Sequence, residues 1–109
     1  MEVVTELDTL GQLRTLHQIL LLYVSGPDCN VCKAVRPKLV ELLRDYPQVY
    51  ACTFDVSSNQ SMAAELEAYS IPLLLVFIEG RESIRMARHI SLGKLAADLD
   101  RYIGLLADA

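Results

Sequence analysis

The apolar residues of this chain follow two kinds of pattern, continuous runs and helical stripes. Residues 18–25 are apolar except at their ends and are followed by Gly26-Pro27. Such a run is typical of a strand buried on both faces of a parallel sheet. A further strand is predicted from Leu73 to Ile78, opened by Ile71-Pro72. Shorter strand patterns cover residues 2–5 and 49–56.

Helical spacing predicts four helices, over residues 7–17, 30–46 and 59–69 and after a cap at Ser91. In the first helix, Leu7, Leu10 and Leu13 form the apolar stripe, with Leu16 as a further candidate. Pro37 should kink the second helix, because proline removes one backbone hydrogen bond.

The order of the predicted elements defines a fold class. Glu79-Gly80 is typical of a tight turn, so the strand from Glu82 to Arg88 must run antiparallel to the one before it. The order βαβαβαββα describes an α/β fold in which four helices cover both faces of a mixed five-stranded sheet. The length of 109 residues predicts one domain spanning residues 1–109.

Composition narrows the class of function. The net charge of −4 is mild and the basic residues are scattered, which argues against nucleic acid or an anionic membrane as a partner. Glu2 and Glu6 give the N-terminus the wrong charge for a signal peptide, and no apolar run approaches the length of a membrane span. We therefore expect a cytoplasmic protein.

Two cysteines with redox spacing lie where the apolar strand gives way to the second helix. Cys29 and Cys32 are three residues apart, so at a helix start both sulfurs lie on one face and can form a disulfide. The unpaired N–H groups and the macrodipole of a helix start favour a thiolate. This pattern indicates thiol–disulfide exchange.

A zinc site is the alternative interpretation of this cysteine pair. Tetrahedral zinc needs four ligands, and Cys52, His17 and His89 are the remaining candidates. None of them has motif spacing, so we expect no metal and favour the redox interpretation. Cys52 lies in a predicted strand, where a small buried hydrophobe is the expected role.

Several motifs together resemble the thioredoxin family over almost the entire chain. The segment Cys29-Asn30-Val31-Cys32-Lys33, followed by Pro37, is similar to the active-site helix of that family. Ile71-Pro72 resembles the cis-proline that faces the active site. The turn and the final helix are matched by Phe77 with Gly80 and by the segment 91–95. The resemblance implies a thioredoxin-like fold.

The resemblance also implies roles for individual residues. Cys29 would be the exposed attacking thiol, and Cys32 the deeper thiol that resolves the mixed disulfide. Lys33 adds a positive charge nearby, whereas Asp28 opposes a thiolate at Cys29 by repulsion. We therefore expect Cys29 to be reactive with an ordinary pKa. Partner peptides would pair beside Pro72.

The chain departs from the family pattern at four places. Asp28 stands where the family commonly has Trp, and Tyr23 replaces a buried Asp that helps to deprotonate the resolving thiol. Tyrosine cannot accept a proton at neutral pH, so its expected role is to fill the core. Arg88 replaces a glycine beside the peptide groove, where it would attract acidic partners. Asn-Val separates the cysteines instead of Gly-Pro.

These features predict a thiol–disulfide oxidoreductase that reduces protein disulfides and contributes to cell redox homeostasis. Its partners would be protein or small-thiol disulfides and a dithiol reductant such as a thioredoxin reductase or the glutathione system. No cofactor is expected. The alternative is a binding or assembly module of the same fold with a slow or regulatory cysteine pair.

Overall fold

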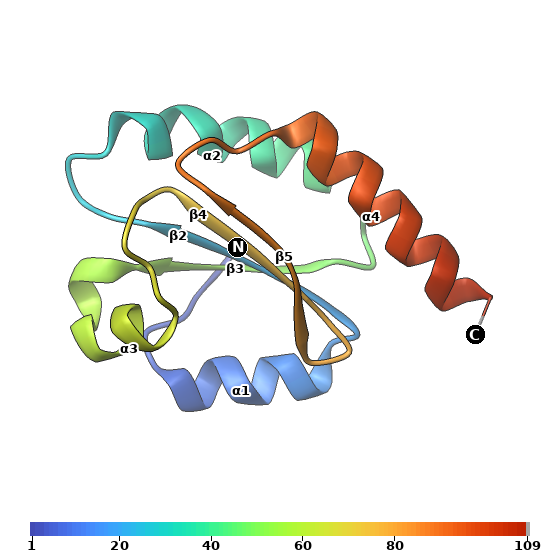
Figure 1. The fold of residues 1–109 in the computed structure, drawn as a ribbon, viewed down its shortest axis with the longest axis horizontal. Helices are drawn as coiled ribbons and strands as arrows, with labels where there is room; N and C mark the ends of the chain where they lie inside the picture. Colours follow the sequence, from blue (N-terminus) through green and yellow to red (C-terminus); the bar gives the residue numbers. More distant parts are fainter. Residues whose placement is uncertain (109) are drawn as a thin grey trace.

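The computed structural model describes residues 1–108, which form one mixed sheet between two layers of helices (Figure 1). The strands are β1 (Glu2–Val3), β2 (Ile19–Ser25), β3 (Tyr50–Asp55), β4 (Leu73–Ile78) and β5 (Arg81–Ala87). The α-helices are α1 (Leu7–Leu16), α2 (Asn30–Leu43), α3 (Gln60–Glu65) and α4 (Leu92–Ala107). A short 3₁₀ helix covers Val56–Ser58. The predicted element order and fold class are confirmed.

The sheet has the strand order β1-β3-β2-β4-β5. Strand β3 runs parallel to both β1 and β2, whereas β4 is antiparallel to β2 and β5 is antiparallel to β4. The central strand is therefore β2, whose C-terminal end leads directly to the cysteine segment. Val24 pairs with Leu73, so the end of β2 lies beside the start of β4.

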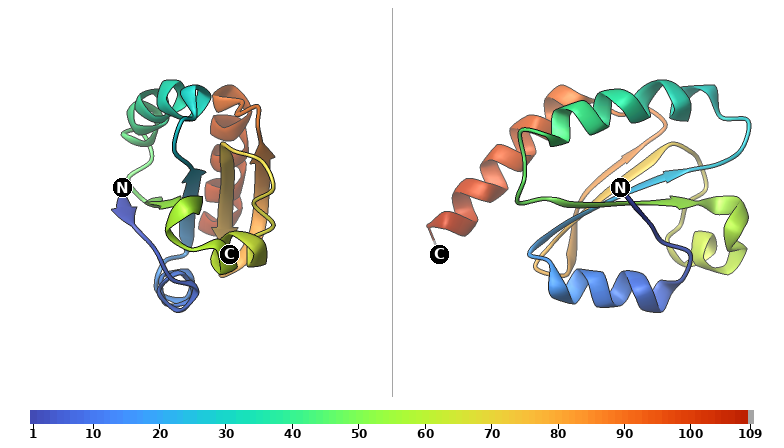
Figure 2. Two further views of the ribbon diagram at one scale, coloured as in Figure 1. Left: turned by 90° about the vertical axis from the view of Figure 1, so that its left-hand side faces the viewer. Right: turned by 180° about the vertical axis from the view of Figure 1, so that it is seen from behind.

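Helices cover both faces of the sheet, with α1 and α3 on one side and α2 and α4 on the other (Figures 1 and 2). Alternate residues of β2 and β4 divide between the two layers, because successive side chains of a strand point to opposite faces. Leu20, Leu22 and Val24 join one core cluster, whereas Leu21 and Tyr23 join the other. This double burial explains the continuous apolar runs of the sequence.

Two helices end three or four residues earlier than the sequence pattern predicts. Helix α2 stops at Leu43 rather than at Tyr46, and the next three residues form i→i−3 turns before Pro47. Helix α3 ends at Glu65 rather than at residue 69. Glu67 adopts a left-handed conformation (φ 54°), and the Ala68 N–H donates to the Ala63 carbonyl in a Schellman arrangement.

Two residues of the predicted apolar stripe lie at the surface. Leu7 is 39% exposed and Leu16 is 74% exposed, whereas Leu10 and Leu13 are buried. Each step of three residues falls about 60° short of a full helical turn, so the stripe leaves the buried face at both ends of α1.

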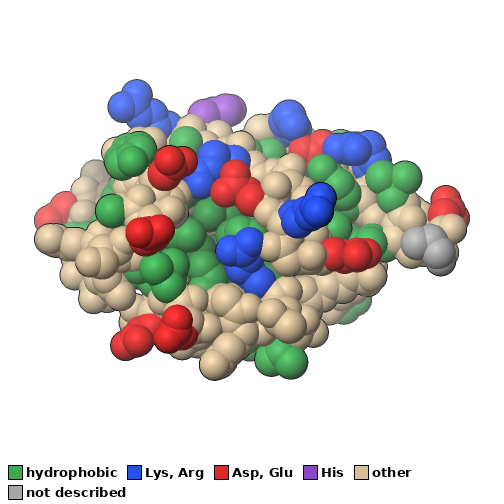
Figure 3. All heavy atoms as spheres, turned by 60° about the horizontal axis from the view of Figure 1, so that its bottom comes forward, with side chains coloured by type: hydrophobic (Ala, Val, Ile, Leu, Met, Phe, Trp, Pro, Cys, Tyr) green, Lys and Arg blue, Asp and Glu red, His purple; other side chains and the backbone are tan. Residues whose placement is uncertain are grey.

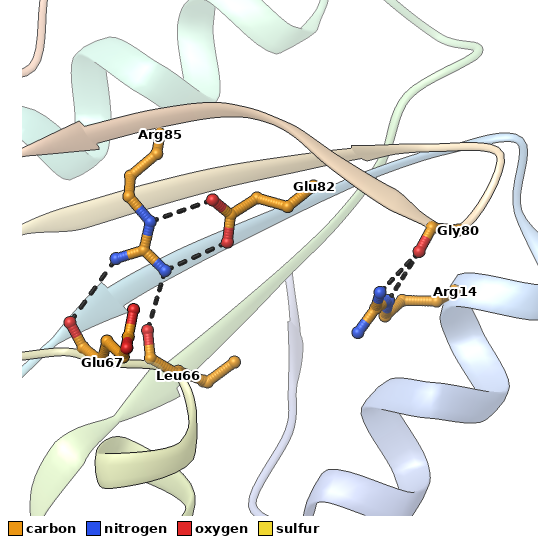
Figure 4. A network of polar contacts seen from close by, with 6 residues as sticks. All are labelled: Arg14, Leu66, Glu67, Gly80, Glu82 and Arg85. Atoms are coloured by element: carbon orange, nitrogen blue, oxygen red, sulfur yellow. Dashed lines mark hydrogen bonds and ion pairs between the residues drawn. The ribbon is translucent and has the colours of Figure 1, made fainter.

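Arg14 connects helix α1 to the turn between β4 and β5 (Figure 4). Glu79 (φ 50°) and Gly80 (φ 83°) form the two-residue turn between β4 and β5, and the positive φ at both positions is typical of a type I′ hairpin. The Arg14 guanidinium donates to the Gly80 carbonyl through Nε and Nη2 and lies over the Phe77 ring. This contact joins α1 to the turn.

A second arginine joins β5 to the end of α3. Nη2 of Arg85 donates to the Leu66 carbonyl at 2.8 Å, and Nε and Nη2 also contact the Glu82 carboxylate (Figure 4). The carbonyls at a helix C-terminus lack partners within the helix, and a guanidinium can satisfy them. Arg85 thus anchors the chain just before it enters the Ile71-Pro72 loop.

Charged side chains of both signs are intermixed on the face of the molecule shown in Figure 3, with hydrophobic side chains between them. This face therefore offers no uniform field of one sign. Within residues 1–108, no helix combines the length and apolar content needed to cross a membrane.

Candidate redox site

Cys29 and Cys32 are joined by a disulfide at the start of α2, with their Cα atoms 5.3 Å apart. Cys29 is the N-cap residue, and its Sγ accepts a hydrogen bond from the Cys32 N–H at 3.2 Å. Its carbonyl accepts from the Lys33 N–H. The sulfur of Cys29 thus takes the place that a capping oxygen usually occupies, where the unpaired N–H groups favour negative charge.

The two sulfur-bearing residues differ in burial. Cys32 is 3% exposed, whereas Cys29 is half-buried and borders solvent. In the reduced protein, a partner would therefore reach Cys29 before Cys32. This asymmetry agrees with the assignment of Cys29 as the attacking thiol and Cys32 as the resolving thiol.

Gly26 allows the chain to pass close to the Ile71 loop on its way from β2 to α2. A Cβ atom at residue 26 would lie 2.8 Å from Cδ1 of Ile71 and 3.1 Å from Cγ2 of Val56. Such distances are shorter than ordinary carbon contacts. The segment before Cys29 therefore packs directly against Ile71.

The Ile71-Pro72 peptide bond is cis, as the resemblance predicted. Pro72 is buried and immediately precedes β4, and its carbonyl accepts a hydrogen bond from the Arg88 N–H at 2.8 Å. The loops before β4, after β5 and before α2 gather at the same end of the sheet, on the left in Figure 1. Pro72 and the disulfide thus share one end of the molecule.

Charged residues surround this end. Asp28, Lys33 and Arg88 are exposed, and so is His89, which follows Arg88. Asp28 (φ 57°) and Arg88 (φ 66°) both adopt the left-handed conformation, which favours glycine. The chain therefore presents a carboxylate directly before Cys29 and a guanidinium directly after β5.

A polar network that the sequence did not predict lies beneath Cys32. Tyr23 is fully buried, as expected, but its hydroxyl also donates to the Cys32 carbonyl at 2.8 Å. Nη2 of Arg36 donates to Oγ1 of Thr53 at 3.1 Å, and Thr53 donates to the Tyr23 carbonyl at 3.0 Å. Arg36 also faces the Tyr23 ring, 5.5 Å from its centroid. The four-residue interval between Cys32 and Arg36 could have indicated this neighbourhood.

The phenol of Tyr23 remains protonated at neutral pH. Burial raises its pKa, and the positive charge of Arg36 opposes this shift without overcoming it. Tyr23 therefore acts as a hydrogen-bond donor toward Cys32. It cannot accept the proton of the resolving thiol, as the buried Asp of the family would.

The remaining cysteine and the two histidines lie apart from this network. Cys52 is fully buried, and its Sγ contacts the Leu21 carbonyl at 3.4 Å. His17 ends α1 and stacks on Tyr50 at 3.9 Å, whereas His89 is exposed. Among residues 1–108, no three His, Cys, Asp or Glu side chains are grouped so that they could hold a metal ion.

A mixed sheet between helical layers, with a disulfide at a helix start, defines an α/β dithiol–disulfide protein. A family model described as Thioredoxin matches residues 4–101. The chain belongs to the thioredoxin family. Membership and the cysteine pair together support thiol–disulfide oxidoreductase activity in general.

Individual relatives give the same result. The thioredoxin-like protein YdfQ of Bacillus subtilis is 32% identical over 89 residues, which cover 82% of this chain and 80% of YdfQ. A thioredoxin of Staphylococcus aureus is 36% identical over 76 residues, or 69% of this chain and 73% of that protein.

Solved structures share the fold at lower identity. Mitochondrial thioredoxin 3 of Saccharomyces cerevisiae has a TM-score of 0.83 at 21% identity, with 93% of this chain and 94% of that chain covered. Fasciola hepatica thioredoxin has a TM-score of 0.80 at 22% identity, with 94% and 99% covered.

Proposed function

We propose that this protein is a protein disulfide reductase that contributes to cell redox homeostasis as a single thioredoxin-like domain over residues 1–109. The observation that carries the proposal is the disulfide at the start of α2, with Cys29 bordering solvent and Cys32 buried. This placement lets a partner contact the Cys29 sulfur while the Cys32 sulfur stays within bonding distance of it.

The proposed cycle moves two electrons from the dithiol to a partner disulfide. The Cys29 thiolate attacks one partner sulfur, so the partner S–S bond breaks and the first partner thiolate leaves and takes a proton from water. Cys32, having lost its proton to water, then attacks the Cys29 sulfur. The Cys29–Cys32 bond forms and the second partner thiolate leaves. A dithiol reductant must restore the reduced pair.

The backbone of Ile71 is the proposed docking point for a partner peptide. Among residues 1–108, no backbone group hydrogen-bonds to the N–H or the carbonyl of Ile71. Both groups are thus available to pair with an extended segment, as in β-augmentation. Pro72 separates this docking point from the start of β4. Gly26 lets the segment before Cys29 pack against Ile71, so the docking point lies next to the cysteine segment.

Charge at this end is proposed to select the partner. Arg88 lies directly after the residue that pairs with Leu73, and its backbone is tied to Pro72. Its guanidinium should favour acidic partners, including small thiols that carry carboxylates. Asp28 should disfavour acidic groups next to Cys29 itself. Lys33 and Pro37 are proposed to support the active-site helix.

A pair of matched peptide disulfides tests this selectivity, one flanked by Glu and one by Lys. We expect the protein to reduce the Glu peptide several times faster, and Arg88→Glu to reverse that preference. Arg81→Glu, at the other end of β5, is the control and should leave it unchanged. Equal rates for both peptides in the unmodified protein would contradict the role of Arg88.

Reduction of insulin disulfides in the presence of dithiothreitol tests the proposed activity. We expect turnover that is lost in Cys29→Ser and in Cys32→Ser and retained in Cys52→Ser. Absence of turnover in the unmodified protein would favour the binding module with a slow or regulatory cysteine pair. The observation that favours such a module is the exposure of two large apolar side chains, Val31 (54%) in the first turn of α2 and Tyr69 (83%) in the loop before β4.

The proposed setting is the cytoplasm, where a thioredoxin reductase or the glutathione system would supply electrons. The proposed partners are protein or small-thiol disulfides. The cycle uses sulfur chemistry alone and requires no metal or organic cofactor.

A further inference from the structure

The polar network beneath the disulfide connects three elements to a single cysteine. Tyr23 comes from β2, Thr53 from β3 and Arg36 from α2. Thr53 accepts from Arg36 and donates to the Tyr23 carbonyl, so its hydroxyl is occupied on both sides. The Tyr23 hydroxyl then reaches the Cys32 carbonyl at 2.8 Å. These contacts fix both the Arg36 guanidinium and the peptide that carries Cys32.

The charge of Arg36 is not neutralised by a neighbouring carboxylate. The ion pairs within residues 1–108 are Arg44–Glu41, Arg85–Glu82 and Lys94–Asp98, and none of them includes Arg36. No Asp or Glu side chain within residues 1–108 is buried, so no buried carboxylate stands near Cys32 as a base. The resolving thiol must therefore lose its proton without a buried carboxylate.

Arg36 follows Cys32 by one helical turn, and residues at i and i+4 are neighbours on a helix surface. A fixed positive charge close to a thiol favours its thiolate, and the low polarity around a buried group strengthens the effect. The Arg36 guanidinium also lies over the Tyr23 ring, and this contact helps to fix its position because a cation is attracted to the face of an aromatic ring.

We propose that Arg36 and Tyr23 are positioning residues for the resolving step: Arg36 favours the Cys32 thiolate electrostatically, and the Tyr23 hydroxyl holds the Cys32 peptide in place. This inference rests on the proposed disulfide exchange. In the step concerned, Cys32 releases its proton to water and its sulfur attacks Cys29. The Cys29–Cys32 bond forms, the Cys29–partner bond breaks, and the partner leaves as a thiolate.

The test separates formation of the mixed disulfide from its breakdown. Reduced protein is mixed rapidly with a peptide disulfide that carries a fluorophore on one side and a quencher on the other. Release of the first peptide thiol reports attack by Cys29, and acid-quenched mass spectrometry follows loss of the mixed disulfide. A purely structural role would slow both steps or neither.

Arg36→Met should slow breakdown of the mixed disulfide about three- to tenfold and leave its formation within about twofold. A thiol that ionises less readily has less thiolate, and its higher nucleophilicity offsets only part of that loss. Arg36→Lys, which keeps the charge, should recover most of the rate. Lys38→Met removes an exposed charge from the same helix and is the matched control.

Tyr23→Phe keeps the ring but removes the hydroxyl. It should slow breakdown about threefold, because the Cys32 peptide loses one hydrogen bond. This second variant keeps the inference testable if Arg36→Met does not fold, which circular dichroism would show.

Two results would overturn the inference while leaving the proposed function intact. One is breakdown at the unmodified rate in both Arg36→Met and Tyr23→Phe. The other is equal slowing in Arg36→Met and Arg36→Lys, since the charge would then be irrelevant. Failure of the proposed function itself would look different, because the unmodified protein would then form no mixed disulfide.

Discussion

At the level of single residues, the chain holds charged side chains in backbone conformations that usually select glycine. The non-glycine residues with positive φ in the described part of the chain are Asp28, Glu67, Glu79 and Arg88. Two of these, Asp28 and Arg88, lie at the disulfide end. Backbone strain of this kind is often found at functional sites. The placement supports a role in partner selection for these two side chains.

Replacing Arg88 by glycine should stabilise the fold. A left-handed conformation destabilises a residue with a Cβ atom by roughly 1–2 kcal/mol. Glycine avoids this penalty, but it loses more conformational entropy on folding, which offsets part of the gain in stability. We expect Arg88→Gly to raise the free energy of unfolding by about 1 kcal/mol in urea titrations. Arg88→Ala is the control and should show no such gain. A loss of stability in Arg88→Gly would show that the side chain contributes more than its backbone costs.

Cys52 should be inert in the native protein. Burial raises the pKa of its thiol to about 12, with a smaller contribution from the Glu2 carboxylate. At pH 8, iodoacetamide should modify reduced Cys29 and reach Cys52 only after unfolding. Peptide mass spectrometry locates the adducts, and rapid modification of Cys52 under native conditions would contradict this assignment.

The raised pKa of the Cys52 thiol also makes the free energy of unfolding depend on pH. An unfolded thiol ionises near pH ~8.5, whereas native Cys52 does so near pH 12. The contribution of Cys52 to stability is therefore complete below the unfolded value and is lost as the pH rises toward 12. Cys52→Ala should lessen the decline in stability across that alkaline range.

At the level of helices and strands, the sequence predicts most of the elements and misses some of their ends. Strand β4 has the predicted bounds, and Ser91 caps α4 as expected, accepting a hydrogen bond from the Lys94 N–H. The end of α3 could not be read from the pattern, because Glu67 takes the left-handed position where glycine is the usual signal. Tertiary contacts decide that boundary, including those of Arg85.

Loss of Arg85 should loosen the end of α3. Its guanidinium donates to the Leu66 carbonyl and lies partly exposed, so Arg85→Met should lower the free energy of unfolding by only about 1 kcal/mol. Hydrogen exchange should show a larger local effect at the amides of α3. Arg81→Met, on the same strand, is the control. Unchanged exchange in α3 would mean that Arg85 does not anchor this helix.

Removing the Ser91 cap should weaken α4. Oγ of Ser91 accepts from the Lys94 N–H at 3.2 Å, and loss of such a cap typically costs about 1 kcal/mol. We expect Ser91→Ala to lower the midpoint of thermal unfolding. Ser61→Ala, at an exposed position inside α3, should not do so. Equal effects in the two variants would contradict the capping role.

Across the whole molecule, the sequence predicts the sheet, the helical layers and the meeting of Pro72 with the cysteine segment at one end. Periodic burial and the family motifs carry that information. The four-residue interval indicates that Arg36 lies near Cys32, but the contacts of Arg36 with Tyr23 and Thr53 could not be predicted, because they depend on the register of β2 against β3 and on the rotation of α2 above them. In the sequence, Arg36 is one of several charged residues of the predicted helix, and only the fold shows that its guanidinium lies against the Tyr23 ring.

Trapping of the mixed disulfide tests the division of labour between Cys29 and Cys32 most directly. Reduced Cys32→Ser and Cys29→Ser, each also carrying Cys52→Ala, are incubated with a peptide disulfide and analysed by non-reducing mass spectrometry. We predict that Cys32→Ser accumulates a stable adduct at Cys29, whereas Cys29→Ser, whose remaining thiol is buried, accumulates almost none. An adduct that forms equally well at Cys32, or none in either variant, would contradict the proposed cycle.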